Sequence, residues 1–154
     1  MTDRQAITVR EARREEVAAI VALLADDHLG KDREEPAAMD AYLAAFERVA
    51  ADPRNLLCVA EDGAGRVVGT FQMTLIPGLS NRGAELALIE AVRIASDRRG
   101  EGLGEAMIGW AMDEARRRGA SAIELFTHNS RADAQRFYER LGFARSHVGM
   151  RRGL

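Results

Sequence analysis

Gly100, Gly102 and Gly104 stand at alternate positions between a predicted strand and a predicted helix. Because glycine has no Cβ, such a run lets backbone N–H groups approach a ligand closely. The unpaired N–H groups and the dipole at the start of a helix favour an anion there. Arg98 and Arg99 add two guanidinium donors beside the loop. We therefore predict a phosphate site; a plain strand-to-helix turn is the alternative, but a turn needs fewer glycines and no paired arginines.

Two kinds of nucleotide-binding site use comparable loops, but this chain lacks the residue types that each of them requires. A P-loop ends in Gly-Lys-Ser/Thr, and no such string with the required spacing occurs in the chain. The dinucleotide fingerprint needs Gly or Ala three residues after its second glycine, where this chain has Glu105 or Met107. The predicted phosphate therefore belongs to a different kind of ligand.

The elements around the loop follow from hydrophobic periodicity and turn residues. Apolar or alternating runs predict strands at residues 7–10, 56–61, 67–76, 86–94 and 122–126, and a last strand or two within 143–150. Helical spacing of apolar residues predicts helices at residues 11–26, 36–52, 102–118 and 131–141. The order is β-α-α-β-β-β-α-β-α-β, an α/β sheet of mixed direction with helices on both faces. With no repeat or linker, residues 1–154 are predicted to form one domain.

Composition argues against several classes of partner. The net charge of −2 supplies no basic field for duplex nucleic acid or an anionic membrane. No window approaches the roughly 18 apolar residues of a membrane span, and residues 1–5 lack the apolar core of a secretory signal. We therefore predict a cytoplasmic protein without nucleic-acid or membrane partners. The single cysteine, Cys58, lies in an apolar run and is predicted to be a buried strand residue rather than a catalytic thiol.

Two motifs, in the expected order, resemble those of the GNAT superfamily of N-acetyltransferases. Residues 92–104, VRIASDRRGEGLG, are similar to its acetyl-CoA motif, Gln/Arg-x-x-Gly-x-Gly/Ala, with Arg99, Gly102 and Gly104 at the patterned positions. Residues 133–143, DAQRFYERLGF, are similar to its C-terminal FYEKLGF helix and strand. The resemblance is strongest from about residue 85 to 143. It implies a GNAT-like, mostly antiparallel sheet, acetyl-CoA as co-substrate and no metal.

The resemblance also implies which residues hold the cofactor. Backbone amides near Val92 and Ile94 would bind pantetheine and the thioester oxygen, and the glycine loop would bind the pyrophosphate. Family members often have a cofactor-contacting asparagine seven residues before the tyrosine, where this chain has Arg131, with Asn129 two residues earlier. The predicted cofactor contacts are Val92, Ile94, Arg99, Gly100, Gly102, Leu103, Gly104, Asn129 and Arg131.

Two residues are candidates for catalysis. Tyr138 occupies the family's position for the general acid that protonates the departing thiolate; a tyrosine packed in the core is the alternative. Glu90 lies within an apolar run, where a carboxylate is costly unless it is paired, hydrated or used. We expect it to be partly buried and to act as the base, as a glutamate on this strand does in many relatives. The alternative, equally weighted, is an exposed strand residue paired with Arg93 or Arg82.

These observations predict an N-acetyltransferase that transfers the acetyl group of acetyl-CoA to a primary amine of a small molecule or peptide by direct attack in a ternary complex. A non-catalytic acyl-CoA sensor or regulatory domain is the alternative. Relatives are often homodimers, so the resemblance allows a dimer. In relatives the region between the first two helices lines the acceptor site. In this chain the region carries His28 together with Asp26, Asp27 and Asp32. The three acidic residues could attract a cationic amine; the alternative is a solvated charged loop.

Overall fold

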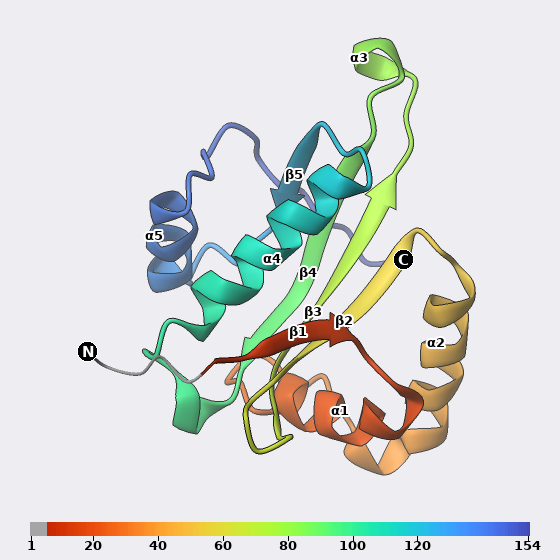
Figure 1. Cartoon of the computed structure of the whole chain (residues 1–154), viewed down its shortest axis with the longest axis vertical. Coiled ribbons are helices and arrows are strands. Elements are labelled where there is room, and N and C mark those ends of the chain that lie inside the picture. The colour runs from red at the N-terminus through yellow and green to blue at the C-terminus, as the bar shows by residue number, and fades with distance from the viewer. Residues whose placement is uncertain (1–5) are drawn as a thin grey trace. The chain divides into compact units, whose positions relative to one another are not determined.

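Five strands form one sheet in the order β1-β2-β3-β4-β5 (Figure 1). The strands are β1 (Thr8–Glu11), β2 (Asn55–Glu61), β3 (Val67–Ile76), β4 (Leu86–Ile94) and β5 (Ala122–Leu125). Three pairs of neighbouring strands are antiparallel: β1 with β2, β2 with β3, and β3 with β4. A hairpin turn at residues 62–65 joins β2 to β3, with the Asp62 carboxylate accepting the N–H groups of Ala64 and Arg66 at 3.0 Å each. The predicted α/β sheet is confirmed.

This computed structural model describes residues 6–154, so the expectation that residues 1–5 carry no secretory signal lies outside the described residues. The chain divides into two units, residues 1–124 and residues 125–154, and each is described by itself. Within residues 6–154 no helix combines the length and the apolar character needed to cross a membrane.

The helices occupy the predicted intervals, with short 3₁₀ turns at several starts. They are α1 (Val17–Ala25), α2 (Met39–Ala51), α3 (Ser80–Gly83), α4 (Leu103–Arg117) and α5 (Ala132–Arg140). The 3₁₀ turn Pro36–Ala38 precedes α2 because proline supplies a helical φ without needing a partner for its nitrogen. The short α3 lies in a stretch predicted as loop, and Asn81 and Arg82 there have φ of 50° and 63°, left-handed values inside a single turn.

Helices lie against both faces of the sheet in residues 6–124. On one face, Phe71 of β3 packs edge-on against Trp110 of α4, with 6.1 Å between ring centroids. Gly69 lies on that same face, and a Cβ built there would come within 2.5 Å of the Met107 sulfur, so its lack of a side chain lets α4 approach closely. On the opposite face α1 and α2 contact β3 and β2.

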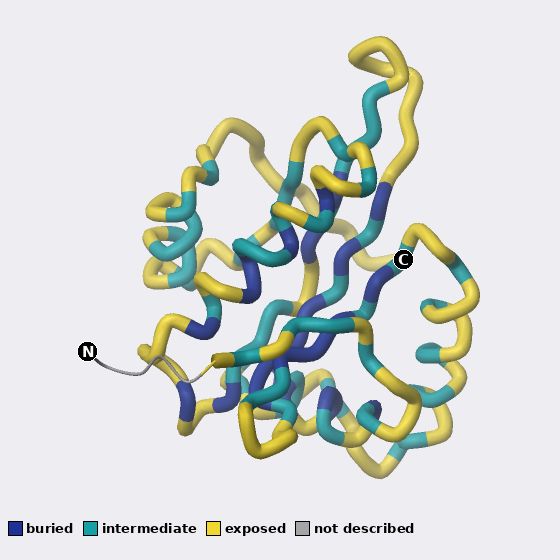
Figure 2. Tube along the Cα trace, in the orientation of Figure 1, coloured by how far each residue is buried: buried dark blue, intermediate teal, exposed yellow. Residues whose placement is uncertain are grey.

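The core runs through β2, β3 and the first half of β4, and the longest buried stretches of these strands lie in β2 and β3 (Figure 2). Successive strand residues alternate between the two helix-covered faces, so these strands are apolar on both sides. Cys58 of β2 is fully buried, and this burial raises the pKa of its thiol to about 12. The prediction that Cys58 is a buried strand residue is therefore confirmed.

The expected last strand within residues 143–150 is absent, since the structure assigns no strand there. Val148 and Met150 are 89% and 94% exposed. A strand needs a partner strand to satisfy its backbone groups, and the few apolar residues of this segment are separated by the polar run at residues 145–147. In this structure the element order therefore ends at α5.

Candidate acetyl-CoA and acceptor site

A β-bulge interrupts β4 just after Glu90. Ala91 and Val92 together stand opposite Phe71 of β3, so β4 carries one extra residue. The register pairs on either side are Gln72 with Glu90 and Thr70 with Arg93. Ala91 has φ of 54°, a left-handed conformation that is uncommon for residues other than glycine. Because a bulge breaks the hydrogen-bond ladder, it turns backbone groups near Val92 away from regular pairing, next to the predicted amide donors.

The glycine loop leads from β4 directly into α4, as predicted. Gly100 and Gly102 have φ of 82° and 81°, and Gly102 is the N-cap residue immediately before α4, its carbonyl accepting the Ala106 N–H at 3.1 Å. A Cβ built on Gly100 would meet no heavy atom within 4 Å, so the loop has open space on that side. Leu103 is buried, so its side chain anchors the helix while the first-turn N–H groups point along the helix axis toward the loop. This geometry fits an anion such as a pyrophosphate.

The two arginines before the loop have different roles. Arg98 is buried, donating from Nε to Glu101 at 2.8 Å and from Nη1 to Asp62 at 3.0 Å. It therefore ties the loop to the β2–β3 turn and is not the ligand-facing donor that the sequence suggested. Arg99 is exposed, and its Nη2 donates to the Asp26 carbonyl at 3.0 Å. Of the pair, Arg99 therefore remains the predicted phosphate contact.

Glu90 is exposed, which contradicts the expected partial burial. The bulge explains this, since Glu90 is followed by Ala91, also exposed, where β4 departs from regular pairing. Glu90 stands in register with Gln72, whose Nε2 lies 3.4 Å from the Asn55 side-chain oxygen. Polar side chains thus run across three strands on one face of the sheet. The alternative pairing of Glu90 with Arg93 does not describe the structure, because the Arg93 guanidinium reaches Asp27.

Asp26 and Asp27, which follow α1, connect the end of that helix to β4 and to the segment that leads into the glycine loop. Asp27 Oδ2 lies 3.2 Å from Arg93 Nη2, and its other oxygen lies 3.4 Å from His28 Nδ1. The Asp26 carboxylate accepts the Ser96 N–H at 3.3 Å. These two acids therefore act as internal ties, contrary to the suggestion that they attract a cationic amine. Their spacing in the sequence did not reveal this, because their partners lie in a distant strand and turn.

Tyr138, Asn129 and Arg131 belong to the second unit. The half-buried Tyr138 lies in α5, its ring centroid 5.1 Å from that of Phe137 and 5.8 Å from that of Phe143. Arg131 is the N-cap residue immediately before α5, and its N–H donates to the His128 carbonyl at 2.9 Å. Asn129 is exposed, and its carbonyl accepts from Gln135 at 3.1 Å. Asn129 and Arg131 therefore share one turn at the start of α5.

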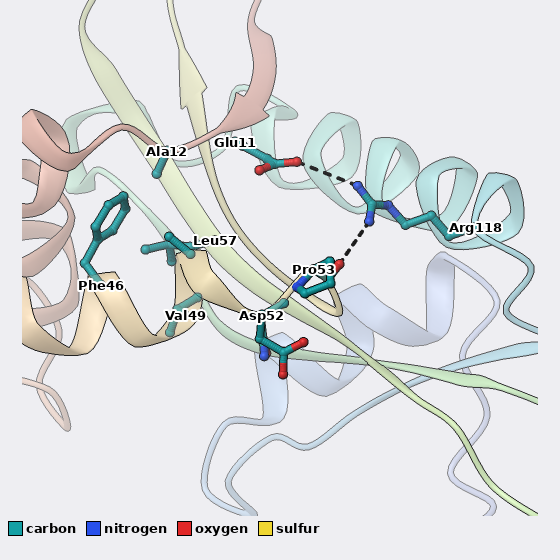
Figure 3. A pocket seen from close by; sticks show the side chains of 10 residues that line it. Glu11, Ala12, Phe46, Val49, Asp52, Pro53, Leu57 and Arg118 are labelled. Atoms are coloured by element: carbon teal, nitrogen blue, oxygen red, sulfur yellow. Dashed lines mark hydrogen bonds and ion pairs between the residues drawn. The ribbon is translucent and has the colours of Figure 1, made fainter.

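A pocket of about 250 Å³ lies in the first unit beside α2 (Figure 3). Phe46, Val49 and Leu57 supply apolar walls, and Arg118 and Glu11 lie 3.7 Å apart at its rim. None of the residues predicted to be catalytic or to bind the cofactor lines this pocket. It is therefore separate from the bulge and the glycine loop.

Comparison with known proteins agrees with the resemblance found in the sequence. A model of the Acetyltransferase (GNAT) family matches residues 17–143. The aminoalkylphosphonate N-acetyltransferase of Salmonella typhimurium is 38% identical over 66 residues, which cover 43% of each chain. The mycothiol acetyltransferase of Kocuria rhizophila is 33% identical over 98 residues, covering 63% of this chain and 32% of the relative. The match thus spans less than half of either relative.

Solved structures share the whole fold. A protein described as a transcriptional regulator from Bacillus halodurans C-125 superposes with a TM-score of 0.93 at 40% identity, covering 97% of this chain and all of the other. Glucosamine-6-phosphate N-acetyltransferase from Arabidopsis thaliana gives a TM-score of 0.77 over 96% of this chain and 98% of its own, at 17% identity, which supports the fold alone. With the family model covering most of its length, this chain belongs to the Acetyltransferase (GNAT) family.

Proposed function

We propose that this protein is an N-acetyltransferase that moves the acetyl group of acetyl-CoA to a primary amine of a small molecule or peptide. The observation that carries the proposal is the sequence of elements at the end of β4. A bulged strand leads into a loop with two left-handed glycines, and this loop opens onto the N-terminus of a 15-residue helix. Such a helix terminus suits a pyrophosphate, and a bulge beside it supplies amides for the rest of an extended cofactor.

The proposed reaction is direct attack in a ternary complex. The amine nitrogen forms a bond to the thioester carbonyl carbon, and the carbon–sulfur bond breaks. A backbone N–H near Val92 or Ile94 stabilises the negative charge that develops on the carbonyl oxygen. Glu90, exposed to solvent, accepts a proton from the amine directly or through water, and Tyr138 delivers a proton to the departing thiolate.

Cofactor binding is divided among several residues in this proposal. Arg99 and the N–H groups of the loop hold the pyrophosphate, with Gly100, Gly102 and Gly104 keeping side chains out of its path. Asn129 and Arg131, at the start of α5, remain predicted cofactor contacts. No step requires a metal ion.

Detection of released CoA thiol tests the proposal directly. Acetyl-CoA is incubated with a panel of amines that includes aminoalkylphosphonates, amino sugars, polyamines, amino acids and peptide N-termini. The aminoalkylphosphonate corresponds to the acceptor named for the Salmonella typhimurium relative, and the amino sugar to that named for the Arabidopsis thaliana enzyme. Amine-dependent CoA release above the rate without enzyme supports the proposal. Mass spectrometry of the product must then show a single added acetyl group on nitrogen.

A second candidate is a non-catalytic acyl-CoA sensor, favoured by the description of the 40% identical structure as a transcriptional regulator. A sensor would bind acetyl-CoA as tightly as an enzyme but release no CoA with any amine. Calorimetric binding of acetyl-CoA, together with a silent amine panel, would therefore favour the sensor. Absence of both binding and turnover would reject both candidates.

A further inference from the structure

We propose that the Asp27/Arg93 pair positions the bulged backbone of β4 for acetyl transfer, an inference that rests on the proposed function. Neither residue is assigned a catalytic or cofactor-binding role above. Both side chains are largely buried, with 14% of Arg93 and 7% of Asp27 exposed. The pair lies where the segment after α1 meets β4.

One guanidinium connects two different structures. Arg93 Nη2 lies 3.2 Å from the Asp27 carboxylate, and Arg93 Nη1 donates a 2.8 Å hydrogen bond to the carbonyl of Val92. The Val92 carbonyl belongs to the peptide bond that closes the bulge. Arg93 therefore links the extra residue of β4 to the chain beyond α1, with one nitrogen for each partner.

A bulge needs such a support because the hydrogen-bond ladder is broken there. Arg93 hydrogen-bonds to the Val92–Arg93 peptide. This peptide lies between the backbone amides of Val92 and Ile94, which are proposed to bind pantetheine and the thioester oxygen. Rotation of that peptide would tilt both amides. Asp27 is itself held in place, since its neighbour Asp26 accepts the Ser96 N–H at 3.3 Å and the Arg99 guanidinium at 3.0 Å. Three points of the site are thus tied to one short segment.

Because the arginine side chain carries two nitrogens in a planar fork, a substitution can distinguish positioning of the β4 backbone from simple charge pairing with Asp27. A lysine at position 93 keeps a cation for Asp27 but has a single ammonium in place of two nitrogens held in a rigid plane. Arg93→Lys is therefore expected to retain most of the fold's stability while losing control of the Val92 carbonyl. Loss of one dedicated oxyanion donor commonly costs about 10²- to 10³-fold, so a misaligned donor should lower kcat by about 10- to 100-fold.

The experiment compares wild type, Arg93→Lys, Asp27→Asn and the double variant. For each, kcat and KM are measured with an accepted amine, CoA affinity by calorimetry and unfolding by heat. Glu16→Gln is the matched control, because Glu16 pairs with Arg10 in another largely buried ion pair, with side-chain exposures of 13% and 21%, away from β4. This control should lose stability and keep kcat within about threefold.

Two results together support the proposal. Arg93→Lys and Asp27→Asn must each lower kcat by at least tenfold while CoA affinity stays within threefold of wild type. The kcat of the double variant must also be no lower than that of Arg93→Lys. Non-additivity is expected because both changes release the same peptide. Wild-type kcat in Arg93→Lys, or a drop confined to thermal stability, would overturn it. Equal losses of CoA affinity and kcat would also overturn it, because they point to general disruption.

A readout without turnover keeps this test separate from that of the proposed function. Acetyl-CoA should shift the amide resonances of residues 92–94 in wild type, and those shifts should be reduced in Arg93→Lys. Identical shifts in both proteins would overturn the positioning role even if the protein proved to be a sensor. A wild-type protein that neither binds acetyl-CoA nor releases CoA would reject the proposed function, and this inference with it.

Discussion

Arg98 and Arg99 are neighbours in the chain, yet one supports the loop and the other faces solvent. Arg98 is buried between Asp62 and Glu101, and hydrogen bonds from the N–H groups of Arg66 and Ala64, together with Arg98, hold the pKa of Asp62 below its usual range. Arg99 contacts only a backbone carbonyl among the hydrogen bonds described, so it can turn to a ligand without breaking an ion pair. Residue type alone did not distinguish them, because burial depends on the β2–β3 turn.

At the residue scale, Tyr138→Phe tests the proposed general acid. The change removes one hydroxyl and keeps the ring that packs against Phe137 and Phe143. General acid catalysis is commonly worth about 10²- to 10⁴-fold, so kcat should fall by that factor while CoA affinity stays near wild type. Steady-state kinetics and calorimetry measure the two quantities. A fall in kcat of less than threefold would mean that water, and not Tyr138, supplies the proton. A loss of CoA affinity equal to the loss of kcat would mean that Tyr138 packs against the cofactor.

At the element scale, α4 carries the glycine loop at its start and a cluster of charges at its end. Its 15 residues bury Leu103, Met107, Ile108, Ala111 and Ala115. Apart from the adjacent Met107 and Ile108, these positions repeat at intervals of three or four, which is why the helix and its start could be predicted from the sequence. The two ends can be tested separately.

Gly102→Val tests the start of α4. A β-branched residue is strained at φ of 81°, and its methyl groups would enter the space where phosphate meets the first-turn N–H groups. CoA affinity should fall by about 100-fold or more, while circular dichroism still shows the folded protein. Gly109→Ala is the control, since it lies inside α4 with no heavy atom within 4 Å of a built Cβ; it should add up to about 1 kcal/mol of stability and keep CoA affinity. Wild-type affinity in a folded Gly102→Val variant would place the pyrophosphate elsewhere.

The end of α4 is predicted to make stability depend on acid. Hydrogen bonds from Arg117 and Arg118 lower the pKa of Glu114 from 4.5 to about 2. Because the folded pKa is the lower one, this contribution is present above pH 4.5 and is lost as the pH falls toward 2. Glu114→Gln should lower the free energy of unfolding by about 1–2 kcal/mol at pH 7, and this difference should shrink toward zero in acid. Urea unfolding across this pH range measures it; a difference independent of pH would contradict the assignment.

The sequence predicted local features well and long-range ones poorly. The glycine loop, the β2–β3 hairpin and the helices depend on residue types within a few positions, so periodicity and turn residues reveal them. The bulge at Ala91 carries no glycine as a signal, because its extra residue arises from pairing with β3. The Asp27/Arg93 pair likewise joins segments that are distant in the sequence. The absent strand at residues 143–150 shows the same limit, since a strand forms only where a neighbour accepts it.

At the scale of the whole molecule, the described units divide the proposed chemistry. The loop, the bulge and Glu90 belong to residues 1–124, whereas Tyr138 and the candidate contacts Asn129 and Arg131 belong to residues 125–154. The family model spans both units, from residue 17 to residue 143. We therefore retain the prediction that residues 1–154 act as one domain. The proposed binding of acetyl-CoA should then stabilise the chain against unfolding.

Ligand-dependent unfolding tests this expectation. A ligand at a hundredfold excess over its dissociation constant adds about 2.7 kcal/mol of stability. Acetyl-CoA or CoA should therefore raise the melting temperature by roughly 5–10 °C, with a single transition. ATP and NAD, which share the diphosphate but lack pantetheine, should do much less. Equal effects of all four ligands would mean that the loop recognises any diphosphate.

The contact between Gly69 and Met107 has a consequence for how this protein can diverge. A Cβ at position 69 would also lie 3.1 Å from Ile94 and 3.2 Å from the Arg93 carbonyl, so little room exists beyond what the methionine occupies. A side chain at position 69 therefore requires the Met107 sulfur to move, either by a change in the methionine's side-chain torsions or by a smaller residue at position 107. Met107 is fully buried in α4, the helix that follows the glycine loop, so either change alters how α4 packs on the sheet. The two positions should therefore vary together among descendants that keep this packing of α4 on the sheet.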